Sequence, residues 1–410
     1  MESKESPDPQ EFKNMSVDRV MITSLQGIAK SPAAVPPAST RNLKYNVIYP
    51  SGDEQEYLPM LSFDNGDSTL TEIDIILKAI EQDRSMKNKN VTTFYFMSPP
   101  GLGKTVLGAH LARLINCPYQ IVNCVSTIND LDLLGSFVLI GQETVWQDGP
   151  LPSIIRATNE NGTGILIINE LNALSLNAQI ALNPLMDKQQ CVVLTLNNNE
   201  IVKVQSDAHL LIIASMNPDI LGVNELQDSV RDRSNAVIYM DYPSVDKEAD
   251  LVSKLVDIHP AIARQFADVI SECRLLKTRD HKITKAPSTR GLLDWINYSR
   301  VWGVETAYKL TIVNRYGTTE DERNALFVIG KGKYIAGITV SPGLGEDGGV
   351  HFVTESIDDH SSTPAIMKSR VQRQAYEMHN EGIDVNTIAK ALGRSRTSIY
   401  RYIRRESLRH

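Results

Sequence analysis

One stretch of the chain joins an apolar run to a glycine-containing loop and then to a segment of helical periodicity. The run covers residues 94–97, the loop 98–105 and the periodic segment 106–115. Glycines in such a loop let backbone N–H groups turn inward around phosphate groups, at the positive end of the following helix. The loop matches the pattern G-x-x-x-x-G-K-[ST] except at its first position, where Ser98 replaces glycine. This stretch predicts a phosphate-binding loop between a strand and a helix, the opening of an α/β fold.

The loop residues indicate ATP and Mg²⁺ as ligands. Lys104 offers a point charge to the terminal phosphates, and Thr105 offers a hydroxyl group to the cation. A Gly/Pro turn that merely precedes a helix is the alternative, but a Gly-Lys-Thr triplet at the helix start disfavours it. The predicted nucleotide-binding residues are Ser98, Pro99, Pro100, Gly101, Leu102, Gly103, Lys104, Thr105 and Val106.

Two further apolar runs end in polar side chains. Residues 165–168 lead into Asn169 and Glu170, and residues 209–214 lead towards Asn217. As parallel strands, these runs bring their carboxyl ends to one edge of a sheet, where open α/β folds place their chemistry. Glu170 is predicted to orient the attacking water, and Asn217 to hold that water or contact the γ-phosphate.

The predicted Mg²⁺ site has one unusual member. Its residues are Thr105, Asn169 and Glu170. Nucleotide hydrolysis ordinarily uses a carboxylate at the position of Asn169 to organise the ligands of the cation. A neutral amide there removes a negative charge beside the cation, which predicts slow hydrolysis.

Taken together, these motifs resemble those of AAA+ ATPases of the MoxR/CbbQ branch, which includes dynein-related and midasin-like proteins. The resemblance covers about residues 68–330. Its other motifs are Leu134-Gly135, Trp146-Gln147-Asp148-Gly149-Pro150-Leu151, Asn169-Glu170-Leu171-Asn172, Met216-Asn217-Pro218 and Ser288-Thr289-Arg290. The family fold is a P-loop α/β core with a parallel sheet and a helical lid, which this chain is therefore expected to share.

The resemblance also implies a role for each matching residue. Lys104 and Thr105 would bind the nucleotide and Mg²⁺, and Glu170 would be the catalytic base. Asn217 corresponds to sensor 1, and Arg290 corresponds to sensor 2.

Arg231 and Arg233 resemble the arginine-finger segment of the family. Asp241-Tyr242-Pro243 follows as in the family, although Ser234 replaces an expected phenylalanine. Arg233, or Arg231 in its place, would reach into the site of a neighbouring subunit. The resemblance therefore implies a homo-oligomer, which in the family is a hexameric ring. A solvated basic pair ahead of a strand is the alternative.

Two β-hairpins are predicted among these motifs. Residues 137–140 and 144–146 flank a turn at Gly141, and residues 192–196 and 201–204 flank three asparagines and a glutamate. In the family, the corresponding hairpins are the helix-2 insert and the pre-sensor-1 hairpin, which move with the nucleotide cycle. The resemblance therefore makes these two hairpins candidates for moving the substrate. Shielding of sheet edges is the alternative.

The C-terminal segment 385–402 has the pattern of a helix-turn-helix. Its inward positions are apolar, Gly393 lies at the turn, and Ser395 is placed to cap the second helix. Residues 365–381 would supply the supporting first helix. The segment resembles the DNA-binding domain of resolvases and invertases. The predicted DNA-binding residues are Ser395, Arg396, Thr397, Tyr400 and Arg401.

Charge separates this tail from the rest of the chain. Residues 367–410 contain ten Lys or Arg and four Asp or Glu, a net charge of +6, whereas the whole chain carries −7. The remainder therefore carries −13, and the attraction for DNA is expected in the tail. A solvated face and a protein-docking domain are the alternatives.

Composition and motif spacing predict six segments in the 410 residues. They are a disordered N-terminal segment 1–40, a small β element 41–67, the AAA+ core 68–245, the helical lid 246–330, a linker with a β-hairpin 331–364, and the all-α helix-turn-helix domain 365–410. The four cysteines lack metal spacing such as C-x-x-C, which favours reduced, packed thiols.

The sequence contains no signal peptide and no apolar run long enough to cross a membrane. A cytoplasmic protein of prokaryotic, archaeal or viral type is expected, associated with the nucleoid through DNA and without a membrane partner.

The leading hypothesis is an ATP-hydrolysing AAA+ remodelling protein, directed to DNA or to a DNA-bound partner by its tail. One alternative is a nucleotide-switched DNA-binding regulator with weak ATPase activity, which the amide at Asn169 favours. Another is a MoxR-like chaperone that acts on a protein substrate with a von Willebrand A-domain partner.

Overall fold

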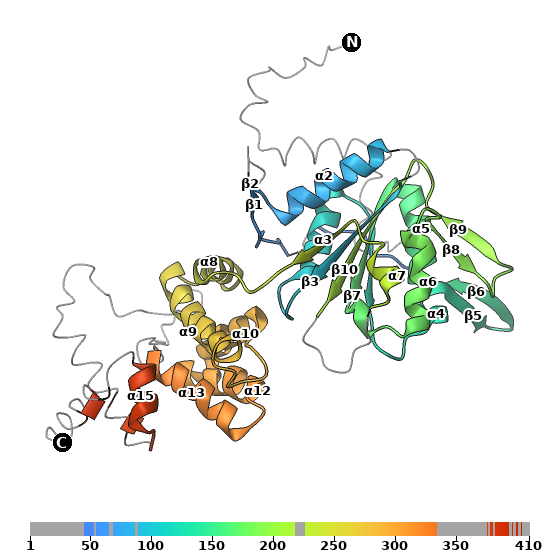
Figure 1. The fold of residues 1–410 in the computed structure, drawn as a ribbon. Coiled ribbons are helices and arrows are strands. Elements are labelled where there is room, and N and C mark those ends of the chain that lie inside the picture. Colours follow the sequence, from blue (N-terminus) through green and yellow to red (C-terminus); the bar gives the residue numbers. More distant parts are fainter. Residues whose placement is uncertain are drawn as a thin grey trace, which may run out of the picture. The chain divides into compact units, whose positions relative to one another are not determined.

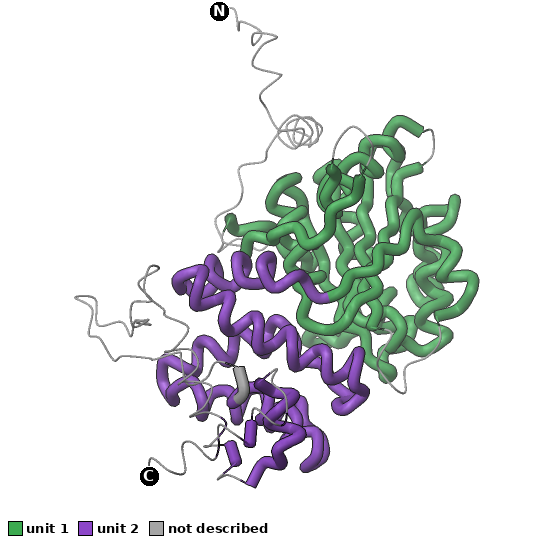
Figure 2. The backbone as a smooth tube through the Cα atoms, turned by 60° about the vertical axis from the view of Figure 1, so that its left-hand side comes forward, with its two compact units in different colours: residues 1–241 green, residues 242–410 purple. Residues whose placement is uncertain are grey.

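The computed structural model describes residues 45–52, 55–64, 69–86, 89–217 and 226–333, and then residues 375, 378–379, 382–392, 396, 399–400 and 403. The chain forms two compact units that divide between Asp241 and Tyr242 (Figure 2). The first unit is a sheet with helices on it, and the described part of the second is helical (Figure 1). The core was predicted to end at residue 245, four residues further along the chain.

A five-stranded parallel sheet forms the centre of the first unit, in the order β11-β3-β10-β7-β4. The strands are β3 (Val91–Met97), β4 (Tyr119–Asn123), β7 (Thr163–Asn169), β10 (His209–Met216) and β11 (Ala236–Tyr239). All eight residues of β10 are buried, as expected of a central strand covered on both faces. The parallel α/β core predicted from the sequence is confirmed.

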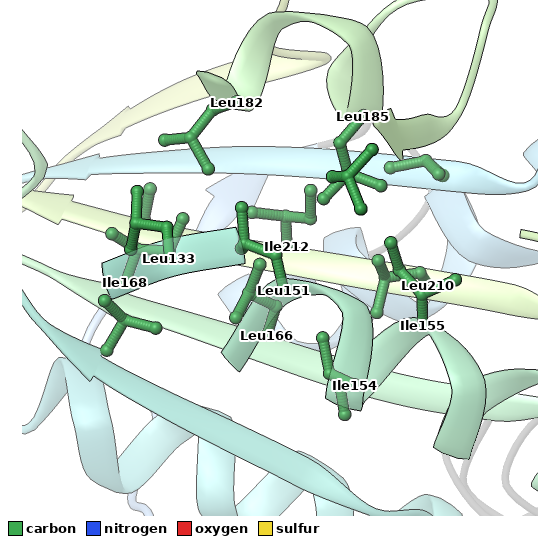
Figure 3. Close-up of a cluster of buried hydrophobic side chains, with 14 of the residues drawn as sticks. Leu133, Leu151, Ile154, Ile155, Leu166, Ile168, Leu182, Leu185, Leu210 and Ile212 are labelled. Carbon is green, nitrogen blue, oxygen red and sulfur yellow. The ribbon is translucent and has the colours of Figure 1, made fainter. Parts of the chain in front are cut away.

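Helices cover the sheet, because alternate strand residues point to opposite faces. The helices of this unit are α2 (Glu72–Ser85), α3 (Lys104–Ile115), α4 (Asp130–Leu134), α5 (Pro150–Asn161), α6 (Leu176–Met186), α7 (Asp228–Arg231) and the 3₁₀ turn η2 (Leu171–Ala173). Leu151 and Ile155 of α5 belong to one core with Leu166 and Ile212 of the strands (Figure 3). This core holds β7 and β10, the strands that end at the predicted site.

Both predicted hairpins are confirmed. The first pairs β5 (Gly135–Ile140) with β6 (Glu143–Asp148), and the second pairs β8 (Cys191–Leu194) with β9 (Glu200–Lys203). Asn198 and Asn199 both have positive φ in the second turn, which asparagine tolerates better than most residues. Both hairpins extend from the same side of the first unit (Figure 1).

The predicted β element over residues 41–67 differs from the structure. Ile48 forms an isolated bridge with Tyr119, and a pair of two-residue strands joins β1 (Phe63–Asp64) to β2 (Thr69–Leu70). Residues 55–61 form no strand, because the backbone N–H groups of Met60 and Leu61 donate to the buried carboxylate of Glu72. A side chain thus supplies the acceptors that a strand partner would otherwise provide.

The second unit is built around aromatic side chains. Its helices are α8 (Val245–Val256), α9 (Pro260–Thr278), α10 (Thr289–Trp302), α11 (Val304–Tyr308), the π-helical η3 (Lys309–Val313), α12 (Asn314–Tyr316), α13 (Glu320–Lys333) and α15 (Val385–Ala391). The ring of Trp295 lies 4.5 Å from that of Phe266 and 4.8 Å from that of Tyr308, between ring centroids. The predicted lid ended at residue 330, whereas α13 continues to Lys333.

Three predicted segments fall on residues that the structure does not describe. They are the disordered segment 1–40, the linker from residue 334 to 364, and most of the first helix of the C-terminal domain. Among the described residues, no helix is both long and apolar enough to cross a bilayer.

Candidate functional site

The phosphate-binding loop lies between β3 and α3. Gly101 and Gly103 have φ values of 84° and 72°, in the left-handed region that glycine adopts without strain. Helix α3 then begins at Lys104. A Cβ atom on Gly103 would lie 3.7 Å from the ring of Tyr57, so this ring packs beside the loop. The chain therefore places free helical N–H groups and a tight turn at one point, as anion binding requires.

The ammonium group of Lys104 is held by the start of its own loop. Nζ donates to the Ser98 hydroxyl oxygen at 2.5 Å and lies 3.3 Å from the Ser98 carbonyl oxygen and 3.2 Å from that of Pro99. Burial lowers the pKa of Lys104 to about 8, while the negative charge of Glu170 opposes this shift. Ser98 therefore does more than replace the glycine of the motif, because its hydroxyl oxygen positions the ammonium group of Lys104.

Three polar side chains form a hydrogen-bonded chain along the carboxyl edge of the sheet. The Thr105 hydroxyl donates to Oδ1 of Asn169 at 2.9 Å, and Nδ2 of Asn169 donates to Oδ1 of Asn123 at 2.8 Å. Asn123 ends β4 and lies opposite Asn169 in the pairing of β4 with β7. These partners orient the amide of Asn169 with its oxygen towards Thr105.

This chain fits a cation that arrives with a nucleotide. With its hydrogen directed to Asn169, the Thr105 oxygen keeps lone pairs for a ligand. Mg²⁺ prefers oxygen donors and is commonly bound through phosphates together with one or two protein groups. Within the part of the chain that the structure describes, no three His, Cys, Asp or Glu side chains gather as metal ligands.

Glu170 lies at a sharp turn directly after β7. Its φ of 59° is in the left-handed region, and its backbone N–H donates to the Ser215 hydroxyl oxygen at 3.3 Å. Two residues further along each segment, Nδ2 of Asn172 donates to the Asn217 carbonyl oxygen at 3.2 Å. These bonds join the ends of β7 and β10, so Glu170 and Asn217 lie at the same edge of the sheet as the phosphate loop. Backbone strain of this kind often marks a functional position.

Arg231 and Arg233 lie at the opposite edge of the sheet from the phosphate loop. They precede β11, whose first residue lies opposite Phe94 in the middle of β3, and Arg233 lines a groove with Lys89, Asn90 and Val91 at the start of that strand. The phosphate loop follows the other end of β3, a strand of seven residues that spans about 20 Å at ~3.3 Å per residue. Neither arginine therefore approaches the loop of its own chain.

The Arg233 guanidinium is partly covered, whereas Arg231 is exposed. Nη2 of Arg233 lies 3.2 Å from Oδ2 of Asp187, and another guanidinium N–H donates to the carbonyl oxygen of Ser229. Arg233 lines an open groove of about 1160 Å³ together with residues that follow β9. The single weak ion pair leaves Arg233 able to exchange its partner for another anion.

Arg290 is exposed in the first turn of α10, in the helical unit. Its neighbour Thr289 donates to Oε1 of Glu248 at 2.7 Å. Glu248 is fully buried and accepts two further hydrogen bonds from Arg274, at 2.6 and 2.7 Å. A bidentate buried pair of this kind is rigid. Through Thr289 it holds the first turn of α10, and therefore the backbone of Arg290, in place.

One arginine joins the base of the first hairpin to the turn end of the second. Nε of Arg156, on α5, lies 2.7 Å from Asp148 at the end of β6, and Nη2 lies 2.6 Å from Glu200 at the start of β9. Large exposed apolar side chains occur along both hairpins and at the second turn: Phe137, Leu139, Ile140, Val145, Leu196 and Ile201. A group of exposed apolar side chains is more typical of a binding surface than of a protective edge.

The described part of the C-terminal domain has the burial that the helix-turn-helix pattern predicts. Helix α15 begins after Asp384, whose carboxylate accepts two backbone N–H groups. Ile399 is buried, whereas Arg396 and Tyr400 are exposed. The other predicted DNA-binding residues lie outside the described residues: Ser395, Thr397 and Arg401.

Two families match separate parts of the chain. The AAA domain of the dynein-related subfamily matches residues 96–234, and the helix-turn-helix domain of resolvase matches residues 358–406. The first match spans the phosphate loop, both hairpins, Glu170, Asn217 and the two arginines. Residues 96–234 are thus an AAA domain of the dynein-related subfamily, with relatives that include CbbQ. The parallel sheet agrees with the P-loop fold of that group.

This AAA+ protein is similar to three proteins of known name. It is 31% identical to protein NorQ of Paracoccus denitrificans over 157 residues, which are 38% of this chain and 55% of NorQ. It is 29% identical to the denitrification regulatory protein NirQ of Stutzerimonas stutzeri over 48% of this chain and 67% of NirQ. It is 28% identical to protein CbbQ of Hydrogenophilus thermoluteolus over 48% of this chain and 69% of CbbQ. The likeness thus spans little more than half of NorQ.

Among solved structures, the AAA+ protein is similar to the RuvB Holliday junction branch migration motor of Thermotoga maritima. The sequences are 13% identical, with 78% of this chain and 80% of that chain covered and a TM-score of 0.36.

Several residues at the sites of this AAA+ protein were not predicted from the sequence motifs. They are Tyr57, Asn123, Arg156, Glu248 and Asp384. Most meet their partners only after distant segments fold together. Asn123 had one local signal, because it ends an apolar-rich segment in the same manner as Asn169.

Proposed function

We propose that this protein is an oligomeric ATPase that its C-terminal helix-turn-helix domain directs to DNA or to a DNA-bound partner. The observation that carries the ATPase assignment is the common position of Lys104, Thr105, Glu170 and Asn217 at the carboxyl edge of three adjacent strands. Phosphoryl transfer needs a phosphate cradle, a cation site and a group that orients water at one place.

In this proposal the loop residues 98–106 bind the phosphates, and Lys104 neutralises the terminal phosphate. Thr105 and Asn169 would hold Mg²⁺, which would supply positive charge against the phosphates. Glu170 orients the attacking water and takes its proton, while Asn217 contacts the γ-phosphate or that water. Arg290 acts as a second sensor of the nucleotide.

The neutral chain of Thr105, Asn169 and Asn123 supports slow turnover. An amide contributes no negative charge to the cation, so the ligands are organised less firmly than by a carboxylate. This observation also favours the second candidate function, a switch in which ATP binding controls assembly and DNA affinity with little hydrolysis.

We expect Asn169→Asp to raise kcat for ATP hydrolysis about tenfold, equivalent to ~1.4 kcal/mol of activation free energy. The carboxylate keeps the acceptor for Thr105 and accepts from Asn123 once that amide rotates, so the fold is retained. Steady-state phosphate release measures the rate. Asn198→Asp, in the exposed turn of the second hairpin, adds the same charge as a matched control.

The gain should depend on Glu170, so Glu170→Gln should abolish turnover in both backgrounds. If the wild-type protein already hydrolyses ATP as fast as Asn169→Asp, the amide is no handicap and the switch function loses its support.

DNA binding is tested on the full chain by fluorescence anisotropy with duplex DNA over a series of salt concentrations. We expect replacement of Arg396 and Arg401 by alanine to weaken binding at least tenfold at moderate salt. The slope of log affinity against log salt should fall by about two, because each lost phosphate contact removes roughly one counterion. Replacing the exposed Arg264 and Arg279 of the helical unit is the matched control and should change neither quantity. Equal binding by both double variants would remove the DNA-reading role of the tail.

A further inference from the structure

Helix α13 carries an unbroken apolar run on every side. Residues 325–329 read Ala-Leu-Phe-Val-Ile, followed by Gly330. A surface helix of a globular domain keeps one polar face, and a helix that is apolar all round is covered on more than one side. The core of the helical unit contains Leu326, and Ala325, Phe327 and Ile329 pack against it, whereas Val328 packs elsewhere.

The inner side of α13 packs into the helical unit. Leu326 is fully buried, and its carbonyl oxygen accepts a hydrogen bond from the Tyr308 hydroxyl at 2.6 Å. A Cβ atom on Gly330 would lie 2.2 Å from the Tyr308 ring, so only glycine allows this close approach. Leu326 and Gly330 are four residues apart and therefore share one face of the helix.

The outer side of α13 packs against the C-terminal domain. Val328 lies two residues from both Leu326 and Gly330, about 200° around the helix from each. It is packed against the core of the C-terminal domain, whose buried members include Met378, Ile388 and Ile399, and α13 and α15 contact one another. A single helix thus belongs to two hydrophobic cores.

The same arrangement leaves the predicted DNA-reading side uncovered. Arg396 and Tyr400 are exposed, while Ile399 between them is buried against Val328's side of the domain core. The contact with α13 therefore uses the apolar interior of the domain and spares the exposed positions of its second helix.

We propose that α13 is a fixed mount that makes the C-terminal domain part of the helical unit, so that this domain follows every movement of that unit. The consequence for DNA rests on the proposed function: nucleotide bound through Arg290 and DNA bound through Arg396 and Tyr400 act on one rigid body. Each ligand then changes the affinity for the other by the same factor. A domain attached only by a flexible connector would respond to nucleotide through assembly alone, so DNA affinities are compared at protein concentrations where the oligomeric state is the same with ATP, with ADP and without nucleotide.

The mount itself is tested by hydrogen exchange on the full-length protein, without DNA. Val328→Asp places a charge in the shared core, and Val301→Asp makes the same change at an exposed valine on α10. We expect the amides of Ile388 in α15 and of Leu392 at its C-terminal cap to exchange about tenfold faster in Val328→Asp, the factor given by losing the burial of one valine. Val301→Asp should leave them unchanged. Unchanged α15 exchange in Val328→Asp would overturn the mount.

Unfolding of the helical unit itself is the competing cause, and exchange in α9 and α10 detects it. Val328→Ala, which removes two methyl groups without adding a charge, serves as the milder variant. We expect it to raise exchange in α15 by a smaller factor while α9 and α10 stay protected. Faster exchange in all three helices of both variants would count against a separate mount.

The coupling is tested by DNA anisotropy with ATP, with ADP and without nucleotide. We expect wild type and Val301→Asp to show nucleotide-dependent affinity, and Val328→Asp to bind DNA with one affinity in all three states. Nucleotide dependence that survives in Val328→Asp, or that is missing from the wild type, would overturn the coupling. A wild-type protein that binds no DNA would overturn the proposed function, while the exchange experiment still decides the mount.

Discussion

Arg233→Ala is expected to lower kcat for ATP hydrolysis about a thousandfold and to leave ATP affinity unchanged. Arg233 lies beside Lys89, Asn90 and Val91 at the start of β3, whereas its own phosphate loop follows the other end of that strand. It can therefore stabilise charge on a transferring phosphoryl group only in another subunit. Calorimetric titration measures the affinity, and phosphate release under saturating ATP measures kcat.

Mixing two inactive variants tests whether Arg233 acts on the site of a neighbouring subunit or on the site of its own subunit. Lys104→Ala subunits keep the arginine and lack the phosphate site, whereas Arg233→Ala subunits keep the site and lack the arginine. Mixed assemblies should regain a part of wild-type activity that neither variant shows alone. Arg231→Ala is the matched control, since Arg231 is the exposed arginine of the same segment. A loss in Arg231→Ala rather than Arg233→Ala would reassign the role, and the absence of any rescue would contradict action between subunits.

Lys104→Ala is expected to weaken ATP binding at least about a hundredfold, because a charge-assisted contact to phosphate contributes up to ~3 kcal/mol. The ammonium group is already positioned by Ser98 and Pro99, so little reorganisation accompanies nucleotide binding. Lys188→Ala, at an exposed lysine away from the phosphate loop, is the control and should bind normally. Unchanged affinity in Lys104→Ala would refute the nucleotide site.

The same lysine makes ATP affinity depend on pH. Burial lowers the pKa of Lys104 to about 8, so the nucleotide-free protein loses this positive charge above pH 8. Phosphate needs the charged form, and binding must then take up a proton. ATP affinity should therefore fall by about tenfold for each pH unit above that pKa. Titrations between pH 7 and pH 10 check the slope, which should vanish in Lys104→Ala.

The sequence predicted the parts of the site that depend on local order along the chain. A strand, a glycine-containing loop and a helix start follow one another within residues 94–115, so their spacing alone determines the phosphate loop. The ends of β7 and β10 were predictable for a similar reason, because parallel strands place their carboxyl ends at one edge. The hairpins followed from alternating apolar runs around turn residues.

The parts that were missed depend on register and on contacts between distant segments. Asn123 reaches Asn169 only because β4 pairs with β7 in one particular register. The buried carboxylate of Glu72 determines the path of residues 55–61, and the pattern of those residues suggested a strand. The contact of α13 with two cores was not predicted, because periodicity does not tell how many partners cover an apolar helix.

The ion pairs of Arg156 have a mechanical consequence. Asp148 and Glu200 would repel each other without the guanidinium between them, so Arg156 links the base of the first hairpin to the turn end of the second. Arg156 is on α5, which leads through Gly162 straight into β7 and on to Glu170. A displacement of the second hairpin's turn is therefore opposed by α5, the helix that directly precedes the strand carrying the residue expected to act on water.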